Sequence, residues 1–257
     1  MVFPPEIGRN HLERTGFFDP ICTIFIGSCL VVLERMGTDF GGTPDRSTFA
    51  RTLSDLKREG SNILLVGDES NDAHDDVCRR LLGEDDDAPR YRLFVLTRDG
   101  EEGCTTAPAA TANAGPVRVV RQAGAPTVDG ADVLTTTVDS EFLSALGMDF
   151  LDVVDEIVAE SDGLEPAQLR VCFDSVRPLV ERHRSETVFR LLHMMTARIR
   201  EENGMGHFHL RLPRDHEIVR LLDPLFDAIV EVRTMDGTVE QRWHLRDGDV
   251  TSDWIAM

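Results

Sequence analysis

The residues with the most suggestive chemistry surround a glycine at the end of a short apolar run. Residues 60–70 read GSNILLVGDES, which predicts a buried strand running into Gly67. A phosphate-binding loop begins in this way and continues through a second glycine to a lysine and a serine or threonine. Here the chain continues through Asp68, Glu69 and Ser70 instead. The pattern therefore predicts a nucleotide-binding architecture whose phosphate site has lost its positive charge.

The only lysine of the chain, Lys57, precedes this apolar run. We expect it at the opposite end of the strand from Gly67, where it cannot contact a phosphate. The acidic residues after Gly67 have two interpretations. In one they cap the next helix and satisfy its dipole, so that they repel a triphosphate. In the other, three of them bind a divalent cation. The acidic side chains are those of Asp68, Glu69, Asp72, Asp75 and Asp76, and the cation ligands would be Asp68, Glu69 and Asp72.

A second acidic strand end lies at residues 169–175, LRVCFDS. An acid after an apolar strand is the pattern that holds magnesium-bound water in nucleotide hydrolases, at the carboxyl edge of the sheet. The alternative is that Asp174 or Ser175 caps the helix running to about Glu181, with Pro178 in its first turn. Both interpretations stay open, because a former catalytic acid can persist as a cap.

The histidines and cysteines give weaker evidence for a functional site than the two acidic strand ends. His207 and His209 alternate on a predicted strand and so share one face, which is half of a possible metal site. No local cysteine or carboxylate completes it, and His216 belongs to the following helix, so we expect core or rim histidines and no metal. Cys172 lies in an apolar run and is expected to be a small core residue. The pair Glu101 and Glu102 is expected to be solvated.

Composition limits the kinds of partner. The net charge is −19, and 26 of the 27 basic residues are arginine. Such a surface repels nucleic acid and anionic lipid, because phosphate binding requires clustered positive charge. An acid-rich, lysine-poor chain resembles proteins that stay soluble in concentrated salt, as in salt-loving archaea. The five cysteines are odd in number in a long chain, which favours a reducing cytoplasm over a disulfide framework.

Residues 1–35 differ from the remainder, because they are nearly neutral and contain the apolar run 21–33. Three interpretations remain. The segment is a short membrane or signal-like element, or it is a packed helix or strand, or translation begins at Met36 and the segment is not part of the native protein. The thirteen-residue run is short for a membrane span. We expect residues 36–257 to form one domain.

Alternating apolar patterns predict an α/β fold with a mostly parallel sheet, helices on both faces and a C-terminal hairpin. Asp236-Gly237 is the hairpin turn signal. Helices are predicted at 45–59, 72–82, 186–201 and 215–226, the last interrupted near Pro224, and 142–160 is predicted as two helical stretches divided at Gly147. Strands are predicted at 63–66, 91–97, 117–121, 132–138, 169–173, 208–212, 228–235 and 239–245.

The strand ending in Gly67, the segment RVCFDSV and the terminal hairpin FDAIVEVRTMDGTVEQRWHLR together resemble the RecA superfamily, especially its KaiC-like branch. The resemblance covers residues 48–247 and is nearest to lysine-less haloarchaeal proteins of unassigned function. It implies a RecA-like fold in which Gly67, Asp68, Glu69, Ser70, Asp174 and Ser175 are vestigial nucleotide-site positions.

Because the loop lacks its lysine, we expect a non-catalytic, KaiC-like module with no cofactor, which regulates or binds protein partners. One alternative is an enzyme or ligand binder at the same sheet edge, with a metal held by Asp68, Glu69 and Asp174. Another is a membrane-tethered signalling component, which rests on residues 20–33 alone.

Overall fold

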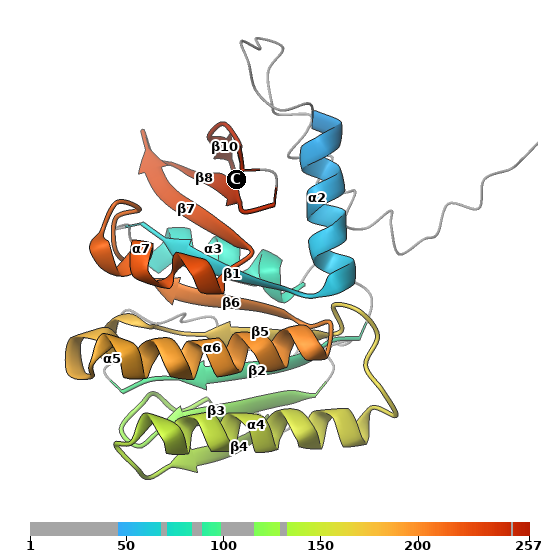
Figure 1. Cartoon of the computed structure of the whole chain (residues 1–257), viewed down its shortest axis with the longest axis vertical. Coiled ribbons are helices and arrows are strands. Elements are labelled where there is room, and N and C mark those ends of the chain that lie inside the picture. Colours follow the sequence, from blue (N-terminus) through green and yellow to red (C-terminus); the bar gives the residue numbers. More distant parts are fainter. Residues whose placement is uncertain (1–45, 68–70, 84–88, 99–115, 129–132, 248) are drawn as a thin grey trace, which may run out of the picture.

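Strands and helices alternate through the computed structural model, which describes residues 46–67, 71–83, 89–98, 116–128, 133–247 and 249–257 (Figure 1). The elements are α2 (Arg46–Glu59), β1 (Ser61–Val66), α3 (Asn71–Leu82), β2 (Tyr91–Leu96), β3 (Val117–Gln122), β4 (Val133–Val138), α4 (Leu143–Glu160), β5 (Leu169–Phe173), α5 (Arg177–Arg182), α6 (Ser185–Glu201), β6 (Met205–Leu210), α7 (Glu217–Leu222), the 3₁₀ turn η2 (Asp223–Leu225), β7 (Ala228–Met235), β8 (Thr238–Leu245), β9 (Val250–Thr251) and β10 (Ile255–Ala256).

One sheet organises these elements, with the strand order β10-β8-β7-β1-β6-β5-β2-β3-β4. The strands from β7 through β4 in this order are all parallel, whereas β8 runs antiparallel to β7 and carries β9 and β10. This arrangement confirms the predicted α/β fold with a mostly parallel sheet and a C-terminal hairpin. The hairpin turns at Asp236 and Gly237, which both have positive φ angles, as such tight turns require.

Helices cover both faces of the sheet, so the central strands are buried on both sides. On one face, α4, α5, α6 and α7 pack over alternate residues of the strands, such as Leu64, Val171 and Phe208. On the other face, α2 and α3 cover the intervening residues, such as Ile63, Leu65 and Phe94. Figure 1 shows α4 and α6 side by side in front of the sheet. The two-sided core explains why residues 63–66 of β1 are all apolar.

The predicted division of residues 142–160 is wrong, because α4 is one continuous helix through Gly147. A Cβ atom at this glycine would lie 2.7 Å from Met194 Cε and 3.1 Å from Leu191 Cδ1, both on α6. The glycine therefore provides a close approach between α4 and α6 and does not end a helix.

Several other boundaries also differ from the prediction. Strand β6 begins at Met205, three residues before the predicted start, and includes Gly206, whose missing side chain leaves room for Asn62 and Ile199. Helix α7 ends at Leu222, and Pro224 lies in the 3₁₀ turn after it. The short strands β9 and β10 were not predicted, because two-residue strands leave no periodic signal.

Within the described residues, no helix combines the length and apolar character needed to cross a bilayer. Residues 1–35, for which three interpretations remain, lie outside the described part of the chain. The predicted cation ligands Asp68 and Glu69, the vestigial position Ser70 and the pair Glu101 and Glu102 also lie outside it.

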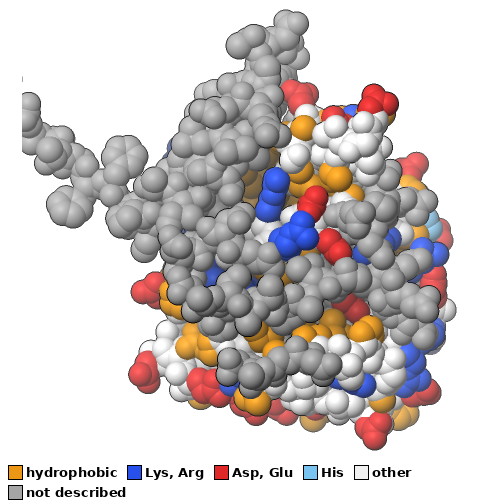
Figure 2. All heavy atoms as spheres, turned by 180° about the vertical axis from the view of Figure 1, so that it is seen from behind, with side chains coloured by type: hydrophobic (Ala, Val, Ile, Leu, Met, Phe, Trp, Pro, Cys, Tyr) orange, Lys and Arg blue, Asp and Glu red, His pale blue; other side chains and the backbone are white. Residues whose placement is uncertain are grey.

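Figure 2 shows acidic and arginine side chains interspersed along the lower rim of the face opposite to that of Figure 1.

Candidate functional site

The carboxyl ends of β1, β6 and β7 meet where the connections of the sheet diverge. From β1 the chain passes through α3 to β2, on one side of the sheet order, whereas from β6 it passes through α7 to β7, on the other side of β1. In open parallel sheets, ligands bind in the crevice outside the strand ends at such a divergence. Gly67 lies directly at this point, at the carboxyl end of the strand where the sequence predicted it.

Gly67 is required by a close backbone contact. Its φ angle is +130°, and a Cβ atom there would lie only 2.3 Å from the carbonyl oxygen of Val232 on β7. Its amide donates a hydrogen bond to the carbonyl oxygen of Leu212 at 3.0 Å. Gly67 is therefore in close contact with the segment after β6 and with strand β7. Only glycine adopts this backbone conformation at such a contact. This packing explains the glycine without reference to a phosphate.

Lys57 lies on α2, which ends at Glu59 before β1 begins at Ser61. The amino end of β1 is therefore the end nearest to Lys57 in the chain, as the sequence predicted, and Gly67 follows the opposite end. In the described part of the chain, the strand end at Gly67 lacks the lysine of a phosphate loop.

Asp174 lies at the carboxyl end of β5 and is 1% exposed. Its carboxylate accepts hydrogen bonds from the amide of Thr97, at 3.0 and 3.1 Å, and from the Thr97 hydroxyl at 2.9 Å. The amide of Ser175 donates to it at 2.5 Å. Thr97 follows β2, so this carboxylate joins the ends of β2 and β5. Both of its oxygens are used within the protein.

The predicted helix cap is wrong. Helix α5 begins after Val176, and no side chain caps its amino end. The carboxylate of Asp174 bonds to the residue that follows it and to Thr97, because the chain turns away from β5 before the helix starts. Ser175 is buried and contributes its carbonyl oxygen, which accepts from the Thr97 hydroxyl at 3.1 Å. Asp174 and Ser175 therefore connect the carboxyl ends of β2 and β5.

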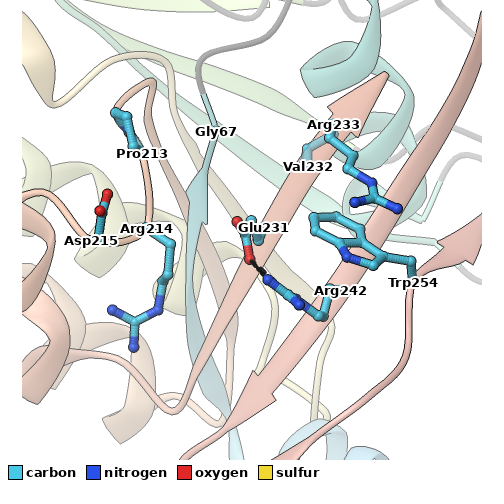
Figure 3. Close-up of a pocket in the computed structure, with 9 residues that line it drawn as sticks. All are labelled: Gly67, Pro213, Arg214, Asp215, Glu231, Val232, Arg233, Arg242 and Trp254. Carbon is cyan, nitrogen blue, oxygen red and sulfur yellow. Dashed lines mark hydrogen bonds and ion pairs between the residues drawn. The ribbon is translucent and has the colours of Figure 1, made fainter. Parts of the chain in front are cut away.

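A pocket of about 620 Å³ opens beside Gly67 (Figure 3). It lies at the strand ends, since Glu231 is level with Val66 in the parallel register of β7 and β1. Figure 3 shows the Trp254 ring lying against the guanidinium groups of Arg233 and Arg242, whose central carbons are 3.8 and 4.4 Å from the ring centroid. The other lining residues are Pro213, Arg214, Asp215 and Val232.

Each arginine of the pocket is paired with an acid, so the pocket does not present free positive charge for an anion. The pairs are Arg242 with Glu231 at 2.7 Å, Arg233 with Glu240 at 2.7 Å and Arg214 with Asp223 at 2.9 Å.

Two titratable groups at this hairpin are perturbed in opposite senses by their surroundings. Burial raises the pKa of Glu231, but hydrogen bonds from Arg242 and His244 outweigh it and leave the pKa below its ordinary value. Burial lowers the pKa of His244, and the positive charges of Arg214 and Arg242 act in the same direction against the opposing bond to Glu231. Glu231 is thus held ionised and His244 neutral near pH 7.

Sequence reasoning missed one constellation on the α3 face of the sheet. His207 and His209 do share that face, as predicted, but Cys78 of α3 and Cys172 of β5 join them there. One ligand atom from each of the four lies within 4.8 Å of the others. The available signal was the spacing of His74 and Cys78, one helical turn apart on α3. His216 is elsewhere, since its ring caps α7 by accepting from the amide of Ile218 at 3.2 Å.

Comparison with known proteins places the chain in a group without an assigned activity. No curated protein matches this sequence. A family model described as a family of unknown function (DUF7504) matches residues 60–232, a range that contains β1 through most of β7 and covers more than half of the chain. The chain therefore belongs to this family of unknown function, DUF7504.

Proposed function

We propose that this protein is a non-hydrolysing, KaiC-like domain that acts as a regulatory or protein-interaction module. The observation that carries the proposal is the internal use of Asp174. A catalytic acid of a nucleotide hydrolase must face the phosphates and their metal ion. Here the carboxylate is buried and bonded to Thr97 and Ser175.

The charge around Gly67 supports the same conclusion. The described arginines of the adjacent pocket are engaged by carboxylates, and Lys57 is on the helix before β1. Phosphoryl transfer depends almost entirely on positioning and on positive charge at the transferred group, and removing such a group costs orders of magnitude in rate. Arginine does not simply replace the missing lysine, because its planar group demands a different geometry.

The alternative of a ligand-binding protein is favoured by one observation, the pocket at the point where the connections diverge. An aromatic ring with two stacked guanidinium groups offers a surface for a flat small molecule. The metal-binding version of this alternative is weaker, because Asp174, the one proposed ligand in the described residues, already bonds to Thr97 and Ser175.

Among the described strands β4 is the last in the sheet order, and this edge is a suitable surface for a protein partner. Edge strands leave backbone groups unpaired and often receive another chain. Close to this edge in the sequence are the exposed side chains of Leu134 on β4, Phe142 before α4 and Met148 on α4, which are 59%, 77% and 64% exposed. We propose that partners contact these residues.

Nucleotide titration of the purified full chain tests the first part of the proposal. In molar KCl, Mg-ATP should leave the melting temperature unchanged, and the protein should release no phosphate above background. A saturable stabilisation by Mg-ATP that Asp174→Ala removes would overturn the proposal.

Partner capture tests the second part. Proteins cross-linked to the chain in its native cells should be lost from a Phe142→Asp, Met148→Asp double variant. Met235→Asp is the matched control, since Met235 is also exposed but lies on β7. Equal loss from the control, or retention by the double variant, would refute the β4–α4 surface.

A further inference from the structure

Four side chains with metal-binding atoms meet in the buried interior between α3 and the sheet. Cys78, Cys172 and His209 are 0% exposed, and His207 is 2% exposed. Their ligand atoms all lie within 4.8 Å of one another. This separation suits a single ion surrounded by four donors.

Three separate features of the fold bring these four side chains together. Cys172 and His207 are direct partners in the parallel register of β5 and β6. His209 follows His207 by two residues and therefore projects from the same face of β6. Helix α3 crosses these strands and adds Cys78, whose Sγ atom is 3.2 Å from His207 Nε2 and 3.7 Å from Cys172 Sγ.

The sulfur separation matches a tetrahedral ion. Zinc–sulfur bonds of about 2.3 Å at tetrahedral angles place two thiolates about 3.8 Å apart, and the observed distance is 3.7 Å. A disulfide requires about 2.05 Å. The charges also balance, since two thiolates and two neutral imidazoles cancel a divalent cation. A neutral complex is the form that a water-free interior tolerates.

Hydrogen bonding identifies which nitrogen of His209 is available. The carbonyl oxygen of Gly67 can only accept, so His74 Nε2, which is 3.4 Å away, must carry the hydrogen. In a neutral ring, His74 Nδ1 is then an acceptor, and His209 Nδ1 donates to it at 3.3 Å. The lone pair of His209 is thus left on Nε2. Within the described structure, this fully buried atom has no hydrogen-bond partner.

We propose that Cys78, Cys172, His207 and His209 bind one zinc ion. The site is closed, with four protein ligands, which is typical of zinc that stabilises a fold. His74 is a positioning residue, because it orients the His209 ring and connects the ion to the carbonyl of Gly67. The ion therefore holds α3, β5 and β6 together and, through His74, also holds Gly67.

Metal analysis of the natively purified full chain tests the proposal. About one zinc per chain is expected. Replacement by cobalt should give the intense visible absorption of a tetrahedral thiolate site. Cys78→Ser and Cys172→Ser should each lose the bound metal and weaken the sulfur-to-cobalt absorption. His193→Gln, on the exposed side of α6, is the matched control and should keep both.

Two measurements keep the proposal falsifiable where a cysteine variant fails to fold. Removing the metal from the wild-type chain with a chelator should lower its melting temperature, and restoring zinc should raise it again, by mass action. His74→Gln should keep the cobalt spectrum but weaken metal affinity by about 10- to 100-fold.

The proposal fails if neither the native chain nor the chain refolded with zinc retains metal. It also fails if Cys78 and Cys172 are found as a disulfide in the native protein, or if the cysteine variants keep the cobalt spectrum.

Discussion

At the residue scale, the buried carboxylate of Asp174 has a structural role. Asp174 receives three hydrogen bonds from Thr97 and the one from the Ser175 amide, and it thereby joins the ends of two parallel strands. A buried group bonded in this way stabilises the fold most through what its removal leaves unpaired.

Asp174→Ala should therefore lower the free energy of unfolding by about 3 kcal/mol, because the amides of Thr97 and Ser175 lose their acceptor inside the protein. Chemical denaturation at neutral pH measures this. Asp174→Asn is the matched variant, which keeps one acceptor oxygen and should lose less. A loss below about 1 kcal/mol in the alanine variant would show that the carboxylate does not hold the strands.

His244 gives a pH-dependent prediction. Its pKa is lowered in the folded protein, chiefly by burial, so the unfolded chain binds the proton more readily. This contribution to stability is present above the ordinary histidine pKa of about 6.5 and is lost as the pH falls below it. The melting temperature should fall less between about pH 7 and pH 5 in His244→Gln than in the wild type. Identical slopes in the two proteins would contradict this.

At the element scale, Gly67, the residue directly after β1, is fixed by contacts on several sides. β7 approaches it at Val232, the segment after β6 bonds its amide, and His74 of α3 contacts its carbonyl. A glycine held in this way is part of the core packing, whereas the glycine of a phosphate loop leaves its amide open to a ligand.

Gly67→Ala should destabilise the protein by more than about 3 kcal/mol, because the backbone of β7 cannot move away from the added Cβ atom. Gly163→Ala is the matched control. Gly163 also has a positive φ angle, but nothing lies within 4 Å of its Cβ position. The control should cost only about 1 kcal/mol from strain. Equal losses in denaturant unfolding would show that the contact with Val232 is relaxed.

The elements also show what local sequence determines. Apolar runs and turn residues suffice for the α/β alternation and for the hairpin at Asp236-Gly237, because these signals are local. The continuity of α4 depends on α6 meeting Gly147, and the early start of β6 depends on a neighbour that fills the space beside Gly206. No local pattern contains these contacts.

The candidate site shows the same difference between features set by local sequence and features set by long-range contacts. The position of Gly67 at the strand end was predictable, since a buried strand followed by glycine is a local signal. The partners of Asp174 and the meeting of Cys78 with His207 were not, because both depend on the order of strands in the sheet. Cys78 and His207 are 129 residues apart in the chain.

At the scale of the whole molecule, the charge predicts how stability responds to salt. A net charge of −19 repels itself in the compact state, and salt screens that repulsion. The melting temperature should therefore rise as KCl is increased from about 0.1 M to 2 M, where the Debye length falls from about 10 Å to below 3 Å. Choline chloride at equal ionic strength is the control for screening. A melting temperature independent of both salts would contradict this interpretation of the composition.

The same scale unites the two sites. The molecule keeps a parallel sheet with its connections diverging at Gly67, while the described residues there are packed and paired among themselves. The cluster of Cys78, Cys172, His207 and His209 is linked to Gly67 through His74. We propose that a metal ion in this cluster stabilises the carboxyl end of β1, and that this strand end does not bind a nucleotide.

Native mass spectrometry of the intact, gently purified chain tests this account most directly. The account predicts the mass of the polypeptide plus a single zinc ion, with no added nucleotide even when Mg-ATP is supplied. A stable adenine nucleotide adduct would contradict it.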